Sequence, residues 1–343
     1  MSYYLYNYSG KSIIDTLLLK PNYLPYKNTL TKNDKVVICI YLPPRILAGY
    51  LSGIEKLINK NIIEIFDKHN SIIFFFNTWE TRPVMKSQLF NIKKISNLLK
   101  CNINRIIICT PEFSKKNEII NNHLSYDIKY LAILDLSYKP VEQNIKKNHS
   151  IIFMNRRPNN ERFQTAKYLY NNYKNRILLS FLCKYGRSDD EFNKKLPLEL
   201  DPSKSVMAGN AWAGIETIRK FLNDAYVMLI FETNWVKEHC QISEKTYKPI
   251  LAGIPFIIWG NKPGILSHLR SLGIRTFEPY IDESYDLDIN NRYDMLLKTL
   301  DTLCLASNKE LQNMYINCLP IINHNLNVLK LKNIPDLFEN INF

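Results

Sequence analysis

Two neighbouring segments in the second half of the chain carry residue types that bind phosphate. Residues 231–234 (Phe-Glu-Thr-Asn) end an apolar run, and residues 242–245 (Ile-Ser-Glu-Lys) open an amphipathic stretch shortly afterwards. Ser243 is a favourable N-cap, so a helix is expected to begin there with backbone N–H groups at its positive end. Lys245 in the first turn adds a cation beside them. The pattern predicts a site for a diphosphate group.

Glu244, next to that lysine, has two interpretations. A carboxylate at a helix start complements the helix dipole and needs no further role. It would also accept hydrogen bonds from ribose or sugar hydroxyls while Lys245 neutralises phosphate. Because a nucleotide sugar presents hydroxyls and phosphates close together, the adjacent opposite charges favour that ligand.

A second group of polar residues follows the apolar run 151–154. Residues 155–162 (Asn-Arg-Arg-Pro-Asn-Asn-Glu-Arg) contain Asn155, Arg156 and Arg162, and they lead into an expected helix. Guanidinium groups bind phosphate oxygens in two-pronged geometry, and a turn between strand and helix delivers them to one sheet edge. A solvated basic turn is the alternative. A third, weaker element is Tyr185-Gly186 after the run 177–182, where an aromatic ring could stack on a base or sugar.

The elements that position these residues alternate along the chain. Apolar, β-branched runs predict buried strands, and amphipathic runs between them predict helices, which together indicate an α/β fold with parallel sheets. The expected strands are 36–42, 72–76, 105–109, 130–136, 151–154, 177–182, 226–231, 256–259 and 275–277. The expected helices are 46–66, 84–99, 161–172, 212–222, 244–251 (ending in a left-handed C-cap at Gly253), 264–272 and 309–329, the last interrupted at Pro320.

A polar stretch at 142–149 divides this alternation into two series. We therefore expect an N-terminal α/β domain over 1–145, a C-terminal α/β domain over 146–305 that binds the nucleotide sugar, and a helical tail over 306–343 that packs across both. Two Rossmann-like domains of this kind face each other across a crevice, and the carboxyl ends of their strands are the expected ligand site.

The second domain resembles the nucleotide-binding half of the α-1,3-fucosyltransferase family, glycosyltransferases of the GT-B fold. The resemblance rests on Asn155 with Arg162, on Tyr185-Gly186, on Phe231-Glu232 and on the Ser-Glu-Lys helix start with its Gly and Pro exit. It spans about residues 151–260, and residues 264–286 are similar to uncharacterised, viral-type relatives. The family differs in two places: an aromatic residue stands where this chain has Gln241, and Asn directly follows Phe-Glu, where Thr233 precedes Asn234 here.

The resemblance implies an inverting transfer of a sugar from a nucleotide-diphosphate donor, with a GDP-sugar favoured, to a hydroxyl of a glycan or another polymer. Arg162 and Lys245 would then hold the donor diphosphate, and Glu244 would meet ribose or sugar hydroxyls. The remaining donor-binding candidates are Asn155, Arg156, Tyr185, Gly186, Glu232, Asn234 and Ser243.

An inverting transferase needs a general base within hydrogen-bond reach of the attacking hydroxyl. We expect it from the first domain, where Glu80 follows the run 72–76 beside Trp79, and Glu112 follows the run 105–109. Either carboxylate could instead be a paired surface group. No metal or other cofactor is expected: Asp189-Asp190 and the 286–288 pair lie in polar stretches and are expected to be solvated, and neither a P-loop nor a GxGxxG fingerprint is present.

The balance of 45 Lys and Arg against 32 Asp and Glu gives a net charge of +13, so the surface should attract anions. A bias toward Lys, Asn and Ile in an AT-rich genome explains the charge equally well. The alternative function is a nucleic-acid-binding protein or a DNA-modifying sugar transferase, and a third is an inactive scaffold. Seven Cys without a CxxC pair, no signal peptide and no apolar run long enough to span a bilayer predict a cytoplasmic protein of a cell or an infected host cell.

Overall fold

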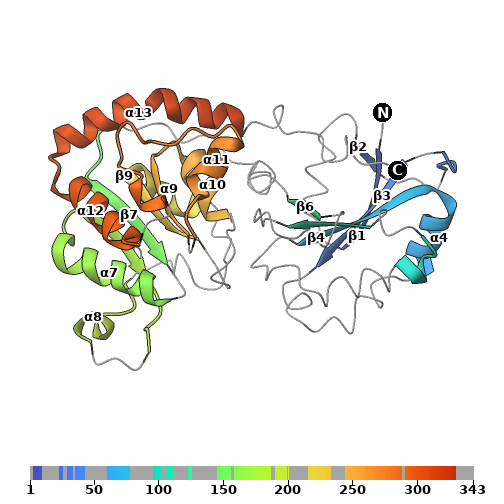
Figure 1. Ribbon diagram of the computed structural model, residues 1–343, viewed down its shortest axis with the longest axis horizontal. Coiled ribbons are helices and arrows are strands. Elements are labelled where there is room, and N and C mark those ends of the chain that lie inside the picture. The colour runs from blue at the N-terminus through green and yellow to red at the C-terminus, as the bar shows by residue number, and fades with distance from the viewer. Residues whose placement is uncertain are drawn as a thin grey trace. The chain divides into compact units, whose positions relative to one another are not determined.

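The chain divides into two compact α/β units, as the alternating runs predict (Figure 1). The first unit comprises residues 1–134, 233–243 and 334–343, and the second comprises 135–232 and 244–333. The structure is a computed structural model. It describes residues 3–9, 23–25, 29–33, 35–42, 60–77, 96–101, 106–110, 123–125, 145–155, 158–186, 190–198, 200, 215–232, 244–260, 262–287 and 290–329.

The first unit contains a six-stranded sheet in the order β2-β1-β3-β4-β5-β6. Every neighbouring pair is parallel. The strands are β1 (Tyr3–Ser9), β2 (Tyr23–Pro25), β3 (Lys35–Leu42), β4 (Asn70–Asn77), β5 (Ile106–Thr110) and β6 (His123–Ser125). Helix α4 (Lys60–Lys68) precedes β4 and buries Ile62, Ile65 and Phe66 at helical spacing. The expected strand 130–136 and most of the expected helices 46–66 and 84–99 lie outside the described residues.

The second unit contains a four-stranded parallel sheet in the order β10-β9-β7-β8. Its strands are β7 (His149–Asn155), β8 (Ile177–Phe181), β9 (Ala225–Phe231) and β10 (Phe256–Trp259), and each lies within two residues of its expected position. Every residue of β9 and β10 is buried, because parallel strands covered on both faces are apolar along their whole length.

Helices surround this sheet (Figure 1). They are α7 (Asn160–Tyr173), α8 (Glu191–Lys194), α9 (Ile215–Asn223), α10 (Glu244–Ala252), α11 (Ile265–Ser271), α12 (Arg292–Leu305) and α13 (Asn308–Val328). Four of them, α7 to α10, lie in the connections between its strands. Helix α10 ends at Gly253, which has a φ of 66° and therefore provides the expected left-handed C-cap. Helix α13 packs on α10, where the hydroxyl of Tyr315 donates to the Gly253 carbonyl over 2.9 Å.

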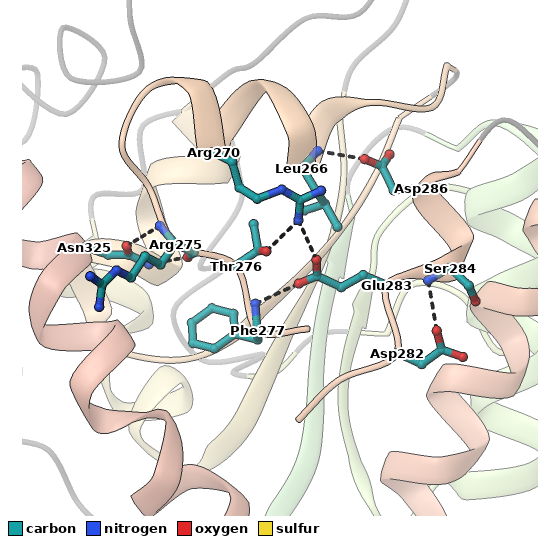
Figure 2. A network of polar contacts seen from close by, with 10 residues as sticks. All are labelled: Leu266, Arg270, Arg275, Thr276, Phe277, Asp282, Glu283, Ser284, Asp286 and Asn325. Atoms are coloured by element: carbon teal, nitrogen blue, oxygen red, sulfur yellow. Dashed lines mark hydrogen bonds and ion pairs between the residues drawn. The ribbon is translucent and has the colours of Figure 1, made fainter. Parts of the chain in front are cut away.

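Two expectations for the C-terminal third are wrong. Residues 275–277 form no strand, because side chains bind their backbone instead: Asn325 pairs with both backbone groups of Arg275, and Glu283 accepts from the Phe277 N–H over 2.7 Å (Figure 2). Helix α13 is continuous through Pro320. A proline inside a helix has no N–H to donate to the preceding turn, which weakens the helix. Here the helix buries Cys318 and Ile322, on either side of Pro320, and this packing offsets the missing hydrogen bond.

The expectation that Asp286 is solvated is also wrong, because only 6% of this residue is exposed. Its carboxylate accepts from the Leu266 N–H over 2.7 Å (Figure 2). Its carbonyl accepts from the Gly264 N–H. Gly264 is the N-cap of α11 and has no side chain to cap it, so Asp286 supplies the missing acceptor from a distant part of the chain. Burial raises the pKa of Asp286 in spite of these hydrogen bonds.

A buried lysine stands at the entry to β7. Lys147 is 2% exposed, its ammonium donates to the Asn223 carbonyl over 3.0 Å, and it lies 4.8 Å from the centre of the Tyr315 ring. Burial lowers its pKa to about 8, against a smaller opposing effect of Asp224. The unfolded chain holds this proton up to a higher pH than the native protein does. The protonated lysine therefore destabilises the fold fully below pH 8, and this cost is relieved as the pH rises.

We expect Lys147→Met to remove that pH dependence. The stability of the variant relative to the wild type should fall by about 3 kcal/mol between pH 8 and pH 10.5, because only the wild type gains stability there. Urea unfolding at a series of pH values measures the difference. Lys146→Met, at an exposed neighbouring position, is the control and should keep the wild-type slope. Parallel curves for wild type and Lys147→Met would contradict the assignment.

Candidate functional site

The candidate site lies where the strand order of the second unit reverses. From β7 the chain adds β8 on one side and then returns to add β9 on the other, so the connections leaving the carboxyl ends of β7 and β9 diverge. Open parallel sheets bind ligands at such points. Asn155 ends β7, and Glu232 directly follows β9, whose residues pair with β7 in register up to Phe153 and Leu229. The structure thus brings two of the predicted site residues to one sheet edge.

Asn155 carries a buried donor at this edge. The residue is 6% exposed, and within the described part of the structure no group accepts a hydrogen bond from its Nδ2. Its backbone carbonyl accepts from the Leu182 N–H over 3.2 Å, so the residue is fixed between β7 and the segment after β8. A buried amide donor without an acceptor costs stability, so its presence calls for an explanation, and a ligand oxygen that accepts from it would be one.

Arg162 connects the first turn of α7 to the end of β9. Asn159 is the N-cap of α7 and accepts from the backbone N–H of Arg162 over 2.8 Å, which sets the arginine at the helix start. The side chain is 7% exposed, and one guanidinium nitrogen donates to the carbonyls of Phe231 and Glu232 over 2.8 and 2.9 Å. The charge of Arg162 therefore lies at the carboxyl end of β9. The two carbonyl partners are a feature that sequence spacing did not indicate.

Glu232 connects the same strand end to α10. The residue is 3% exposed, and its carboxylate accepts a hydrogen bond from the hydroxyl of Thr246, which is fully buried in the first turn of α10. This contact fixes the start of α10 beside the carboxyl end of β9. A buried carboxylate without hydrogen-bond partners is costly, and the Thr246 hydroxyl offsets part of that cost.

Helix α10 begins at Glu244 and places Lys245 in its first turn. The positive end of the helix dipole disfavours a cation there, so Lys245 gains nothing from its own helix. An anion beside the helix start would reverse that balance, because the backbone N–H groups and the ammonium would both face negative charge. The predicted start of this helix is confirmed.

An aromatic and cationic cluster at the end of β10 completes the edge, and the sequence did not reveal it. The indole N–H of Trp259 donates to Glu161 in α7 over 3.1 Å, and the guanidinium of Arg292 lies 4.4 Å from the centre of the Trp259 ring. Arg292 also donates to the carbonyls of Tyr285 and Gly260 over 2.9 and 3.3 Å. These contacts hold the turn after β10 next to the candidate site.

Tyr185 and Gly186 lie after β8, the other neighbour of β7. The Tyr185 ring stacks on Phe163 of α7, with centres 5.2 Å apart and an interplanar angle of 29°. Gly186 has a φ of 64°, and beyond its chain neighbours no atom of the described residues lies within 4 Å of the position of a Cβ there. An aromatic ring at this strand end was predicted, and the stacking on α7 shows how it is held.

The other predicted site residues fall outside the described residues: Glu80, Glu112, Arg156, Asn234 and Ser243. The 189–190 pair was expected to be solvated, and of it the structure describes Asp190, which caps α8 and pairs with Lys167. In the described ranges, no group of three His, Cys, Asp or Glu side chains comes together as metal ligands would. Of the helices described, none has the length and apolar character needed to cross a membrane.

No protein-family model and no curated protein matches the chain. Its structure is similar to that of an α1,3-fucosyltransferase at 11% identity and a TM-score of 0.40, covering 100% of this chain and 92% of the other. It is also similar to a structure described as trehalose-6-phosphate from E. coli bound with UDP-2-fluoro glucose, at 12% identity and a TM-score of 0.38, covering 90% of this chain and 74% of the other. At these scores the likeness assigns no activity to this chain.

Proposed function

We propose that the chain is a glycosyltransferase that takes a sugar from a nucleotide-diphosphate donor bound at the carboxyl ends of β7 and β9. The observation that carries the proposal is the meeting of three groups at one edge: the buried amide of Asn155 with no acceptor in the described structure, the buried carboxylate of Glu232, and the first turn of α10 with Lys245. A donor, an acceptor and a cation so placed suit a ligand that carries hydroxyls and phosphates together.

The chemistry follows from where charge develops. The acceptor oxygen bonds to the anomeric carbon of the donor sugar while the bond from that carbon to the diphosphate oxygen breaks, so negative charge grows on the departing diphosphate. The start of α10 and Lys245 would stabilise that charge without reorganising. The Asn155 amide would donate to a donor oxygen, and Arg162 would keep the strand ends in place and add positive charge behind them.

The finer features of this function come from the sequence resemblance. The reaction would be inverting and fucosyltransferase-like, with a GDP-sugar as the favoured donor and a hydroxyl of a glycan or another polymer as the acceptor. Glu80, or else Glu112, would take the acceptor proton. The leaving diphosphate would be stabilised by protein groups without a metal ion.

Release of the nucleoside diphosphate from its sugar tests the proposal. The full chain should release GDP from GDP-sugars faster than UDP from UDP-sugars, and addition of chelator should leave the rate unchanged. Glu80→Gln and Glu112→Gln, assayed with an acceptor glycan, should divide the two candidate bases, because only the true base is needed to accept the proton. If no member of a GDP-, UDP- and dTDP-sugar series is consumed, the proposal is wrong.

Asn155→Leu should separate stability from binding. Leucine has a similar shape and removes the buried donor, so the free protein should become about 1 kcal/mol more stable, or at least no less stable. The same change removes a hydrogen bond to the ligand, so nucleotide affinity should fall by about tenfold. Thermal melting with and without nucleotide measures both effects. A destabilised variant that binds nucleotide normally would show that Asn155 has only a structural role.

A further inference from the structure

Two segments flank the carboxyl end of β8, next to the candidate site. The Tyr185 segment, residues 182–186, continues from the strand, and the return segment, residues 190–198, comes back to it. Leu198 pairs with Phe181 in antiparallel fashion, with hydrogen bonds of 2.9 and 3.0 Å between their backbones. The Tyr185 segment is thus joined to β8 at its start, and the return segment is joined to β8 at its end.

Asn193 of the return segment binds the backbone of Tyr185. Its Oδ1 accepts from the Tyr185 N–H over 3.1 Å, and its Nδ2 donates to the Tyr185 carbonyl over 3.2 Å. One side-chain amide therefore satisfies both backbone groups of a residue that belongs to no helix or strand. Asn193 is 3% exposed, so water does not compete for these bonds.

The short helix that carries Asn193 is itself held in place. Asp190 caps α8 by accepting from the Phe192 N–H over 2.8 Å, and its carboxylate pairs with Lys167 of α7. The centre of the Phe192 ring lies 5.5 Å from the centre of the Phe163 ring. The Phe163 ring also stacks on the ring of Tyr185. The backbone of Tyr185 is thus fixed by Asn193 and its ring by Phe163.

We propose that Asn193 is a positioning residue that holds Tyr185 as one side of the nucleotide site, where it contacts the base. This inference rests on the proposed function. The Tyr185 segment starts at Leu182, whose N–H donates to the carbonyl of Asn155, so a shift of the segment changes the site directly. Tyr185 is only half-buried, which leaves part of its surface for a ligand. Asn193 acts through this tyrosine and does not touch the ligand itself.

Asn193→Ala tests the proposal through the difference between ligands with and without a base. Loss of the two hydrogen bonds should raise the Kd of the nucleoside diphosphate that binds the wild type most tightly by about tenfold. The Kd of inorganic pyrophosphate should stay within about twofold, because pyrophosphate has no base to contact Tyr185. Asn193→Asp keeps the acceptor for the Tyr185 N–H but not the donor, so its affinity should fall between the two. Isothermal titration on the folded full chain gives all these values.

Asn172→Ala is the matched control, because Asn172 is an exposed asparagine of α7 that bonds within its own helix. It should bind both ligands as the wild type does. Hydrogen exchange at the Tyr185 amide should be faster in Asn193→Ala and unchanged in Asn172→Ala. Equal losses of nucleotide and pyrophosphate, or no loss of either, would overturn the positioning role while leaving the proposed function in place. If the wild type binds pyrophosphate and no nucleotide, or neither, the proposed function fails and this inference fails with it.

Discussion

Arg162→Met is expected to lower the melting temperature by roughly 10 °C, which corresponds to a loss of about 3 kcal/mol in a unit of this size. The arginine is buried, and its guanidinium donates to two carbonyls at the end of β9. Methionine fills similar space but leaves both carbonyls without that donor. Because these carbonyls lie in the core, water replaces the lost bonds poorly. Differential scanning calorimetry or thermal circular dichroism measures the shift.

Gln164→Met, at an exposed position of the same helix, provides the control and should change the stability by less than about 0.5 kcal/mol. Arg162→Lys should recover part of the lost stability, because the ammonium group can still donate to a carbonyl. The recovery should be incomplete, because an ammonium group reaches the two carbonyls less well than a planar guanidinium does. A wild-type melting temperature for Arg162→Met would show that these bonds contribute little, and Arg162 would then be free to act mainly on the ligand.

Lys245→Ala is expected to reduce turnover of the sugar donor by about 100-fold, which is the scale of removing one group that stabilises developing charge. The fold should tolerate the change, because a lysine in the first turn is disfavoured by the helix dipole and alanine is a better helix former. Steady-state rates of nucleoside diphosphate release, together with thermal melting, measure both effects. The charge-conserving variant Lys245→Arg should keep more of the activity.

Lys248→Ala is the matched control for this position, since Lys248 lies in the same helix almost one turn further on and is half-buried as Lys245 is. It should turn over the donor at close to the wild-type rate. Equal activity of Lys245→Ala and wild type would remove Lys245 from the site, and the anion would then have to be bound elsewhere on the edge.

The strands of the second unit were predictable because a parallel sheet buries both faces, so each strand is a continuous apolar run. Helix starts were predictable where local chemistry marks them, as Asn159 does for α7. Residues 275–277 were not, because a β-branched residue beside an aromatic one, Thr276 and Phe277, is typical of a strand. Their backbone partners, Asn325 and Glu283, come from other parts of the chain. The burial of Asp286 depends on Leu266, twenty residues away, and no local pattern reveals that.

The residues of the candidate site were predictable by type and by position at strand ends. Asn155 and Glu232 end neighbouring strands, and the topology brings them together. The contacts that hold the site together were not predictable. Arg162 contacts the carbonyls of Phe231 and Glu232, which lie 69 and 70 residues further along the chain. Asn193 contacts Tyr185 through packing of two segments that share no regular secondary structure. The Trp259 and Arg292 cluster was missed because its members stand 33 positions apart with no motif between them.

Nucleoside diphosphate binding by the wild-type chain tests the central claim most directly. Thermal melting should be measured with GDP, UDP and dTDP, with the monophosphate CMP for comparison, and with their sugars, because a ligand that binds only the native state raises the melting temperature. We predict a selective rise, largest for GDP and GDP-sugars, that is lost in Lys245→Ala, reduced in Asn155→Leu and kept in Lys248→Ala. The absence of a shift with any nucleotide would contradict the account. Salt-dependent binding of DNA or RNA in the same protein would then indicate that the net charge of +13 serves to bind nucleic acid.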